Sequence, residues 1–281
     1  MQTIGVVGAG TMGHGIAHVA AMAGQDVRLY DAFPGVAEKG LAAIRANLDQ
    51  GVAKGKVDAT ARDAALARIT VVDDLAALAH GADLVVEAIL ERLPLKRELF
   101  ATLSGLVSED CVLATNTSSL SIAAIADAAT HPGRVIGAHF FNPVHLMALL
   151  EIVRHTGTSP EVVEAVKSWG AALGKECIVV HDAPGFATSR LGVCLGMEAI
   201  RMVEQGVASA EDIDKAMVLG YRHPVGPLKL TDMVGLDVRL AIGEYLAREL
   251  KNPAFEPPEL MRKMVVEGRL GKKSGRGFYD W

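Results

Sequence analysis

Three things that the sequence lacks narrow what this chain can be. Its 281 residues include only three cysteines, Cys111, Cys177 and Cys194, which are widely spaced and form no Cys-x-x-Cys pair. This pattern is typical of free thiols in a reducing cytosol, and it disfavours a disulfide framework or a zinc site. No apolar run approaches the roughly 18 residues that a membrane-spanning helix needs. We therefore expect a cytoplasmic protein that has no bound metal and no membrane partner.

The chain also lacks an excess of basic residues. It has 28 lysines and arginines against 33 aspartates and glutamates, which leaves a net charge of −5. Binding to nucleic acid would favour a charge of the opposite sign. Half of the residues are hydrophobic, so the chain can bury a sizeable core. We expect a globular protein without a nucleic-acid partner, and one long enough for two domains.

Strand-like and helical segments alternate over most of the chain. A buried-strand run at residues 3–7 is followed by a helical stretch from about 11 to 23, and a second strand at 27–30 precedes a long helix at about 35–54. Six further strand candidates lie at 69–72, 84–87, 112–115, 134–138, 149–153 and 177–180. This alternation predicts an α/β fold of the Rossmann type, with a doubly wound, mainly parallel sheet.

The pattern changes after Asp182-Ala183-Pro184-Gly185. Beyond this point the periodicity is helical and there is almost no strand signal. Candidate helices lie at 188–205, 209–217, 227–249 and 257–267. We therefore expect two domains, a dinucleotide-binding domain at 1–183 and an all-helical C-terminal domain at 184–281.

A glycine pattern joins the first strand to the first helix. Gly8, Gly10 and Gly13 form a G-x-G-x-x-G loop, and Asp31 ends the second strand 18 residues later. In such loops the glycines allow a tight turn, a close approach to pyrophosphate and close helix packing, while the acid binds the adenosine ribose. Asp31 would also repel a 2′-phosphate, so the pattern favours NAD over NADP. A glycine turn at a sheet edge and an FAD site are the alternatives.

Polar groups follow two later strands. Asn116, Thr117 and Ser118 come after the strand at 112–115, and His139 ends the strand at 134–138. Ligands of open α/β sheets bind at the carboxyl ends of the strands. Glu151 lies within the apolar run at 149–153 and would orient His139 as a general acid/base. The alternatives are a helix N-cap at 116–119 and a hydrogen-bonded core histidine.

The motifs together resemble one family. The chain resembles the L-3-hydroxyacyl-CoA dehydrogenases, particularly the bacterial 3-hydroxybutyryl-CoA type. The resemblance covers essentially the whole chain. It rests on Gly8-Ala9-Gly10-Thr11-Met12-Gly13, Val86-Glu87-Ala88, Thr115-Asn116-Thr117-Ser118-Ser119, His139-Phe140-Phe141-Asn142-Pro143, Pro184-Gly185-Phe186 and the tail at 271–279.

The resemblance implies NAD-dependent, reversible oxidation of an L-3-hydroxyacyl-CoA to the 3-oxoacyl-CoA. It implies that His139 is the general base, that Glu151 orients it, and that Ser118 and Asn142 hold the reacting groups. It also implies a homodimer formed through the C-terminal domain. The cofactor contacts that it implies are Gly8, Gly10, Thr11, Met12, Gly13, Asp31, Glu91, Lys96, Asn116, Ser118, Asn142 and Lys273. The substrate contacts are Lys54, Ser118 and Ser189.

Three positions depart from the family pattern: Ser189 replaces a usual asparagine, His145 a common proline and Ala148 a common lysine. His145 is expected to be a surface turn residue. Lys54, Lys96 and Lys273 would by default be solvated surface lysines. A free hydroxy-acid or sugar-acid dehydrogenase of related fold and a non-catalytic, crystallin-like NAD-binding protein are the alternative functions.

Overall fold

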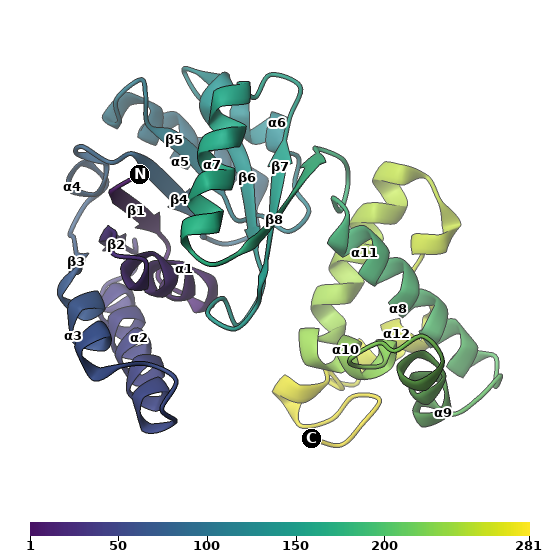
Figure 1. The fold of residues 1–281 in the computed structure, drawn as a ribbon. Helices are drawn as coiled ribbons and strands as arrows, with labels where there is room; N and C mark the ends of the chain where they lie inside the picture. The colour runs from purple at the N-terminus through teal and green to yellow at the C-terminus, as the bar shows by residue number, and fades with distance from the viewer. The chain divides into compact units, whose positions relative to one another are not determined.

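The structure of the protein is a computed structural model that describes residues 1–281. It divides into two compact units, Met1–Ala183 and Pro184–Trp281 (Figure 1). None of its helices is both long enough and apolar enough to cross a membrane.

The first unit is the predicted α/β fold. Its strands are β1 (Thr3–Val7), β2 (Asp26–Tyr30), β3 (Ile69–Val71), β4 (Leu84–Glu87), β5 (Val112–Thr115), β6 (Val135–Phe140), β7 (Leu149–Arg154) and β8 (Glu176–His181). Its helices are α1 (Thr11–Met22), α2 (Val36–Ala53), α3 (Ala59–Ala67), α4 (Leu75–Ala79), α5 (Leu93–Leu106), α6 (Ile122–Ala126) and α7 (Pro160–Ala172).

All eight strands form one sheet in the order β3-β2-β1-β4-β5-β6-β7-β8. Every neighbouring pair is parallel except β6 and β7, which run antiparallel. The parallel part confirms the predicted Rossmann-type sheet. The antiparallel pair has a direct consequence for the site, because its register sets His139 opposite Glu151.

The two faces of the sheet follow from the two-residue period of the strands. On one face, Val6, Val86, Ala114 and Ile136 enter a single core, to which α1, α2 and α7 also contribute side chains. The alternate residues of the same strands point to the other face. That set includes Glu87 at the end of β4 and Thr115 at the end of β5, which are register partners. Polar side chains therefore share one face at the carboxyl edge of the sheet.

Local signals explain where several helices begin. The Asp58 side chain accepts a hydrogen bond from Thr60 N at the start of α3, and Asp74 does the same for Ala77 N at the start of α4. Pro160 opens α7, where its missing N–H leaves no unmet bond within the helix. These caps hold short helices that would be marginal on their own.

The second unit is all-helical, as predicted. Its helices are α8 (Thr188–Glu204), α9 (Ala210–Lys215), α10 (Pro227–Val234), α11 (Leu236–Leu250) and α12 (Glu259–Val266). One prediction here was wrong, because residues 227–249 form two helices and not one. Gly235 separates α10 from α11 with a φ of 107°, a backbone conformation that favours glycine.

Candidate active site

The loop between β1 and α1 leaves space for a phosphate-bearing ligand. Gly8 has a φ of 93°, and a Cβ there would lie 2.6 Å from the Ala88 carbonyl oxygen. A Cβ on Gly13 would lie only 1.6 Å from the Gly8 carbonyl oxygen. A Cβ on Gly10 would meet no protein atom within 4 Å. The first and third glycines are thus required by the fold, whereas Gly10 leaves its side open to a ligand at the N-terminus of α1.

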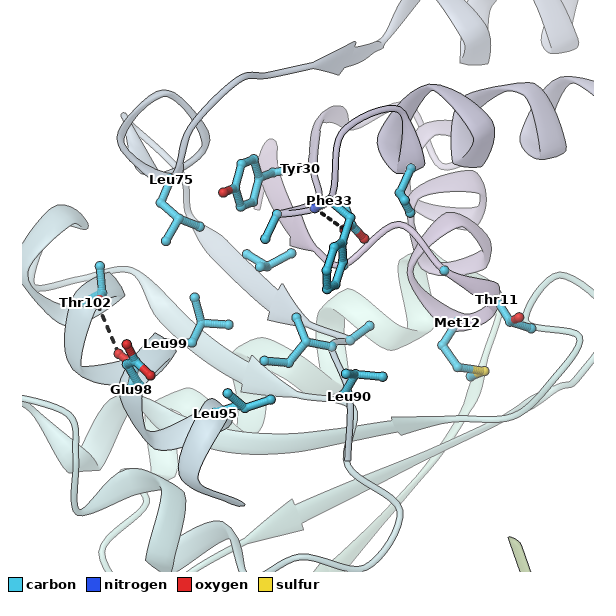
Figure 2. Close-up of a pocket in the computed structure, with 18 residues that line it drawn as sticks. Thr11, Met12, Tyr30, Phe33, Leu75, Leu90, Leu95, Glu98, Leu99 and Thr102 are labelled. Atoms are coloured by element: carbon cyan, nitrogen blue, oxygen red, sulfur yellow. Dashed lines mark hydrogen bonds between the residues drawn. The ribbon is translucent and has the colours of Figure 1, made fainter. Parts of the chain in front are cut away.

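A cavity of about 610 Å³ extends from this loop (Figure 2). Thr11 and Met12 lie at one end, and Glu98 and Thr102 lie at the other. Its lining is mostly apolar, which suits a flat ring system better than a second charged group. The cavity and its glycine loop therefore fit the adenosine half and the pyrophosphate of a dinucleotide.

Asp31 lies in the wall of this cavity. Its Oδ2 accepts a hydrogen bond from Ala9 N at 2.8 Å, and its Oδ1 accepts one from Phe33 N at 3.0 Å. The two backbone contacts fix the carboxylate beside the glycine loop. A carboxylate at this place can accept hydrogen bonds from ribose hydroxyls.

His139 and Glu151 are in contact on neighbouring strands. Nδ1 of His139 lies 2.8 Å from Oε2 of Glu151. The histidine is 5% exposed and the glutamate is fully buried. Because directly opposed residues of an antiparallel pair have close Cβ atoms on one face, the register of β6 and β7 alone brings the two side chains together.

The segment after β5 is bound to its surroundings through side chains. Asn116 Oδ1 accepts a hydrogen bond from Phe140 N at 2.9 Å, which ties the end of β5 to the end of β6. Glu91 accepts bonds from the Thr117 hydroxyl and from Ser118 N, the latter at 3.0 Å. Ser118 follows the carboxyl end of β5 and is half-buried.

Lys96 is not a surface lysine. Only 1% of it is exposed, and its Nζ lies 2.5 Å from Oε1 of Glu87 and 3.2 Å from Oε2 of Glu91. Burial raises the pKa of the Glu87 carboxyl, and the Lys96 ammonium opposes that shift by stabilising the charged form. Sequence reasoning gave Glu87 no role. The available signal was an acid at the end of the apolar strand Leu84–Glu87.

Comparison with known proteins decides the family. The sequence matches the 3-hydroxyacyl-CoA dehydrogenase NAD-binding domain over residues 3–183, and the C-terminal domain of the same family over residues 185–281. The chain belongs to the 3-hydroxyacyl-CoA dehydrogenase family. It is therefore an oxidoreductase with an NAD-binding domain, as the motifs indicated.

Individual members of the family are similar over their full lengths. The 3-hydroxybutyryl-CoA dehydrogenase of Mycobacterium tuberculosis is 44% identical, covering 100% of this chain and 99% of that protein. The probable 3-hydroxybutyryl-CoA dehydrogenase of Bacillus subtilis is also 44% identical, covering 100% and 98%. The solved structure of (S)-3-hydroxybutyryl-CoA dehydrogenase from Ralstonia eutropha has a TM-score of 0.96 at 41% identity, covering 100% of this chain and 99% of that one.

Three of the ligand contacts predicted from the sequence are not among the residues described above. One of them, Lys54, is in the first unit, and the other two, Ser189 and Lys273, are in the second. Lys54 directly follows α2 and is exposed. Ser189 is the second residue of α8 and is half-buried. The Nζ of Lys273 lies 2.6 Å from Oδ2 of Asp237 at the start of α11. Within the second unit, this contact fixes the position of the lysine.

The segment after His139 contacts α1 through an aromatic pair. Asn142 is exposed and precedes Pro143. The ring of His145 stacks on that of His18, with centroids 5.1 Å apart and planes inclined by 19°. His145 is exposed, as expected of a turn residue, but its buried partner was not foreseen. Burial and nearby positive groups lower the pKa of His18 to about 4.

Proposed function

We propose that this dehydrogenase carries out the reversible, NAD-dependent oxidation of an L-3-hydroxyacyl-CoA, with 3-hydroxybutyryl-CoA as its substrate. The proposal rests above all on the contact between Nδ1 of His139 and Oε2 of Glu151. His139 lies near the carboxyl end of β6 and Glu151 lies opposite it near the amino end of the antiparallel β7, so the pair is at the edge where open α/β sheets bind their ligands. The small acyl group is proposed from the 3-hydroxybutyryl-CoA dehydrogenases that the chain resembles over its full length.

His139 acts as the general base in this mechanism. Glu151 accepts a hydrogen bond from Nδ1–H and so fixes the tautomer in which Nε2 carries a lone pair. Nε2 then takes the proton of the substrate hydroxyl as the carbonyl forms. The carboxylate also stabilises the imidazolium that results. The chemistry that NAD supplies when bound is acceptance of the hydride, with its electron pair, from the same carbon.

The other polar groups at this edge hold the reactants. The Ser118 hydroxyl and the Asn142 amide are proposed to bind the reacting oxygen and the nicotinamide side of the cofactor. Asn116 holds the end of β5 against that of β6, and Asp31 binds the adenosine ribose. Lys54, whose charged side chain is exposed, is proposed to meet the coenzyme A phosphates.

The second unit is proposed to form a homodimer. Large apolar side chains that are exposed on it support this proposal: Leu191, Leu219, Tyr221 and Val266 are 72%, 78%, 76% and 88% exposed. The three free cysteines support a cytoplasmic location. Sedimentation of the purified protein tests the dimer, for which the expected mass is twice 29.6 kDa.

Absorbance of NADH tests the proposed reaction. Purified protein mixed with NADH and acetoacetyl-CoA should consume NADH, and free acetoacetate should not replace the thioester. Turnover of free acid at a comparable kcat/KM would instead support a hydroxy-acid dehydrogenase. Normal turnover by the His139→Gln variant would show that the histidine is not the base.

A further inference from the structure

A buried acid–base pair lies beneath the edge of the sheet and has no role in the chemistry described above. Glu87 is fully buried at the end of β4, and its carboxylate accepts three hydrogen bonds. The donors are Lys96 Nζ at 2.5 Å, Thr115 Oγ1 at 2.6 Å and Ile89 N at 2.7 Å. Removing two charges from water costs several kcal/mol per ion, and apolar replacements of such pairs are often as stable or more stable. Stability alone is therefore a poor reason for this pair.

The pair is connected to the exposed edge of the site through one more residue. Lys96 Nζ also lies 3.2 Å from Oε2 of Glu91. The other oxygen of Glu91 accepts bonds from Thr117 and from Ser118 N. The exposed fraction rises along this path, from a fully buried Glu87 through 1% for the Lys96 side chain to 42% for that of Glu91. Glu91 is thus the member that a ligand can reach, whereas Lys96 is enclosed by its two carboxylates.

We propose that Glu87 is a positioning residue for the cofactor site, because it fixes Lys96 and, through Lys96, the orientation of the Glu91 carboxylate and of the Ser118 segment. This inference rests on the proposed contacts of Glu91 and Ser118 with NAD. Lys96 is the residue through which Glu87 acts on Glu91, because its Nζ lies beside both carboxylates. Without the Glu87 charge, the Lys96 ammonium is attracted to Glu91 alone and turns that carboxylate away from its ligand.

Affinity for NADH in the absence of acyl-CoA tests the proposal. Glu87→Gln keeps the shape of the side chain and removes its charge, and we expect about a five- to tenfold rise in the Kd for NADH, the size of a weakened charge-assisted hydrogen bond. The KM for NAD should rise similarly, with little change in kcat, because the lost interaction is uniform between ground and transition states. Loss of folded enzyme alone would lower the apparent kcat and leave both constants unchanged.

A double-mutant cycle identifies the path. Glu91→Gln should also raise the Kd for NADH. Adding Glu87→Gln to this variant should raise the Kd no further, because Glu87 acts on the cofactor only through Glu91. Additive effects of the two substitutions would overturn the proposal. A Kd for NADH within twofold of wild type in Glu87→Gln would overturn it as well.

A control variant separates positioning from stability. Leu103 is fully buried on the same helix as Lys96, and Leu103→Ala should lower the melting temperature without changing the Kd for NADH. If Glu87→Gln does not fold, Glu87→Gln with Lys96→Met removes both charges and should recover stability, yet its Kd should remain raised. If the Kd of this double variant for NADH equalled the wild-type value, Glu87 and Lys96 would contribute to stability alone. Because no acyl-CoA is present, failure of the proposed substrate would leave this test intact.

Discussion

Acid should destabilise the first unit through one buried histidine, His18. This side chain is 5% exposed on α1, and its Nδ1 is buried without a hydrogen-bond partner. Its pKa is lowered from 6.5 to about 4, mainly by burial and also by the nearby His145, His14 and Lys175, which repel an added positive charge. The fold therefore holds His18 in its neutral form.

The size of the effect follows from the two pKa values. A tenfold change in proton affinity corresponds to about 1.4 kcal/mol, so a pKa of about 4 against 6.5 in the unfolded chain corresponds to about 3 kcal/mol. Since the folded pKa is the lower one, the unfolded state binds more protons between the two values. The stabilising contribution is complete above about pH 6.5 and is lost as the pH falls towards 4. At about pH 5 the loss reaches about 2 kcal/mol.

Urea unfolding of His18→Gln measures this contribution, because glutamine fills a similar space and does not titrate. The chain has two tryptophans, and Trp169 is the one in the first unit, where it is 3% exposed. In a Trp281→Phe background, the fluorescence of Trp169 therefore reports unfolding of that unit. Between about pH 7.5 and pH 5, the parent should lose about 2 kcal/mol more unfolding free energy than His18→Gln.

The matched control is His131→Gln, which removes a histidine whose side chain is 51% exposed and which lies outside the stack with His145. It should keep the pH dependence of its parent. Parallel pH profiles for the parent and His18→Gln would refute the reasoning, since they would mean that the protonated histidine is accommodated by the fold at no cost.

Three further perturbations have defined outcomes. His139→Gln should lower kcat by about a thousandfold, as removal of a general base does, with the Kd for NADH within a few-fold of wild type; a fall of less than tenfold in kcat would contradict the proposed base. Asp31→Ser should raise the ratio of kcat/KM for NADP to that for NAD by at least about tenfold, because it removes a charge that repels the 2′-phosphate, and an unchanged ratio would count against that carboxylate. Asp232→Ala should destabilise the second unit by about 3 kcal/mol, because the carboxylate is only 1% exposed and accepts hydrogen bonds from Phe278 N, Tyr279 N and Trp281 Nε1. Urea unfolding followed by Trp281 fluorescence measures this change, and a urea midpoint equal to that of wild type would contradict it.

The features that sequence reasoning could predict are those with a short-range cause. The Rossmann-type sheet follows from strand-like runs that alternate with helical ones. The glycine loop follows from Gly8 and Gly13, where a side chain would collide with the backbone. Even so, a helical pattern does not reveal where a helix breaks. Leu236 and its neighbours continue the periodicity of α10, yet Gly235 divides the two helices.

Part of the site could be predicted because a strand end and a lone acid in an apolar run are both visible in the sequence. Their contact depends on something that is not visible, the antiparallel register of β6 and β7, which a chain of parallel strands does not suggest. A shift of one residue would turn Glu151 to the opposite face of the sheet.

The burial of Lys96 also depends on a contact between elements that the sequence does not reveal. Lys96 begins a run of three charged residues in the first turns of α5, where a lysine ordinarily faces water. It is buried because the end of β4, next to β5 in the sheet, presents the carboxylate of Glu87 to it. The burial of a charge is decided by its partner, and that partner lies on a different element, so no pattern within the helix could have predicted it. The acid that ends Leu84–Glu87 was the one feature that pointed to it, since a carboxylate in a fully buried strand requires a cation nearby.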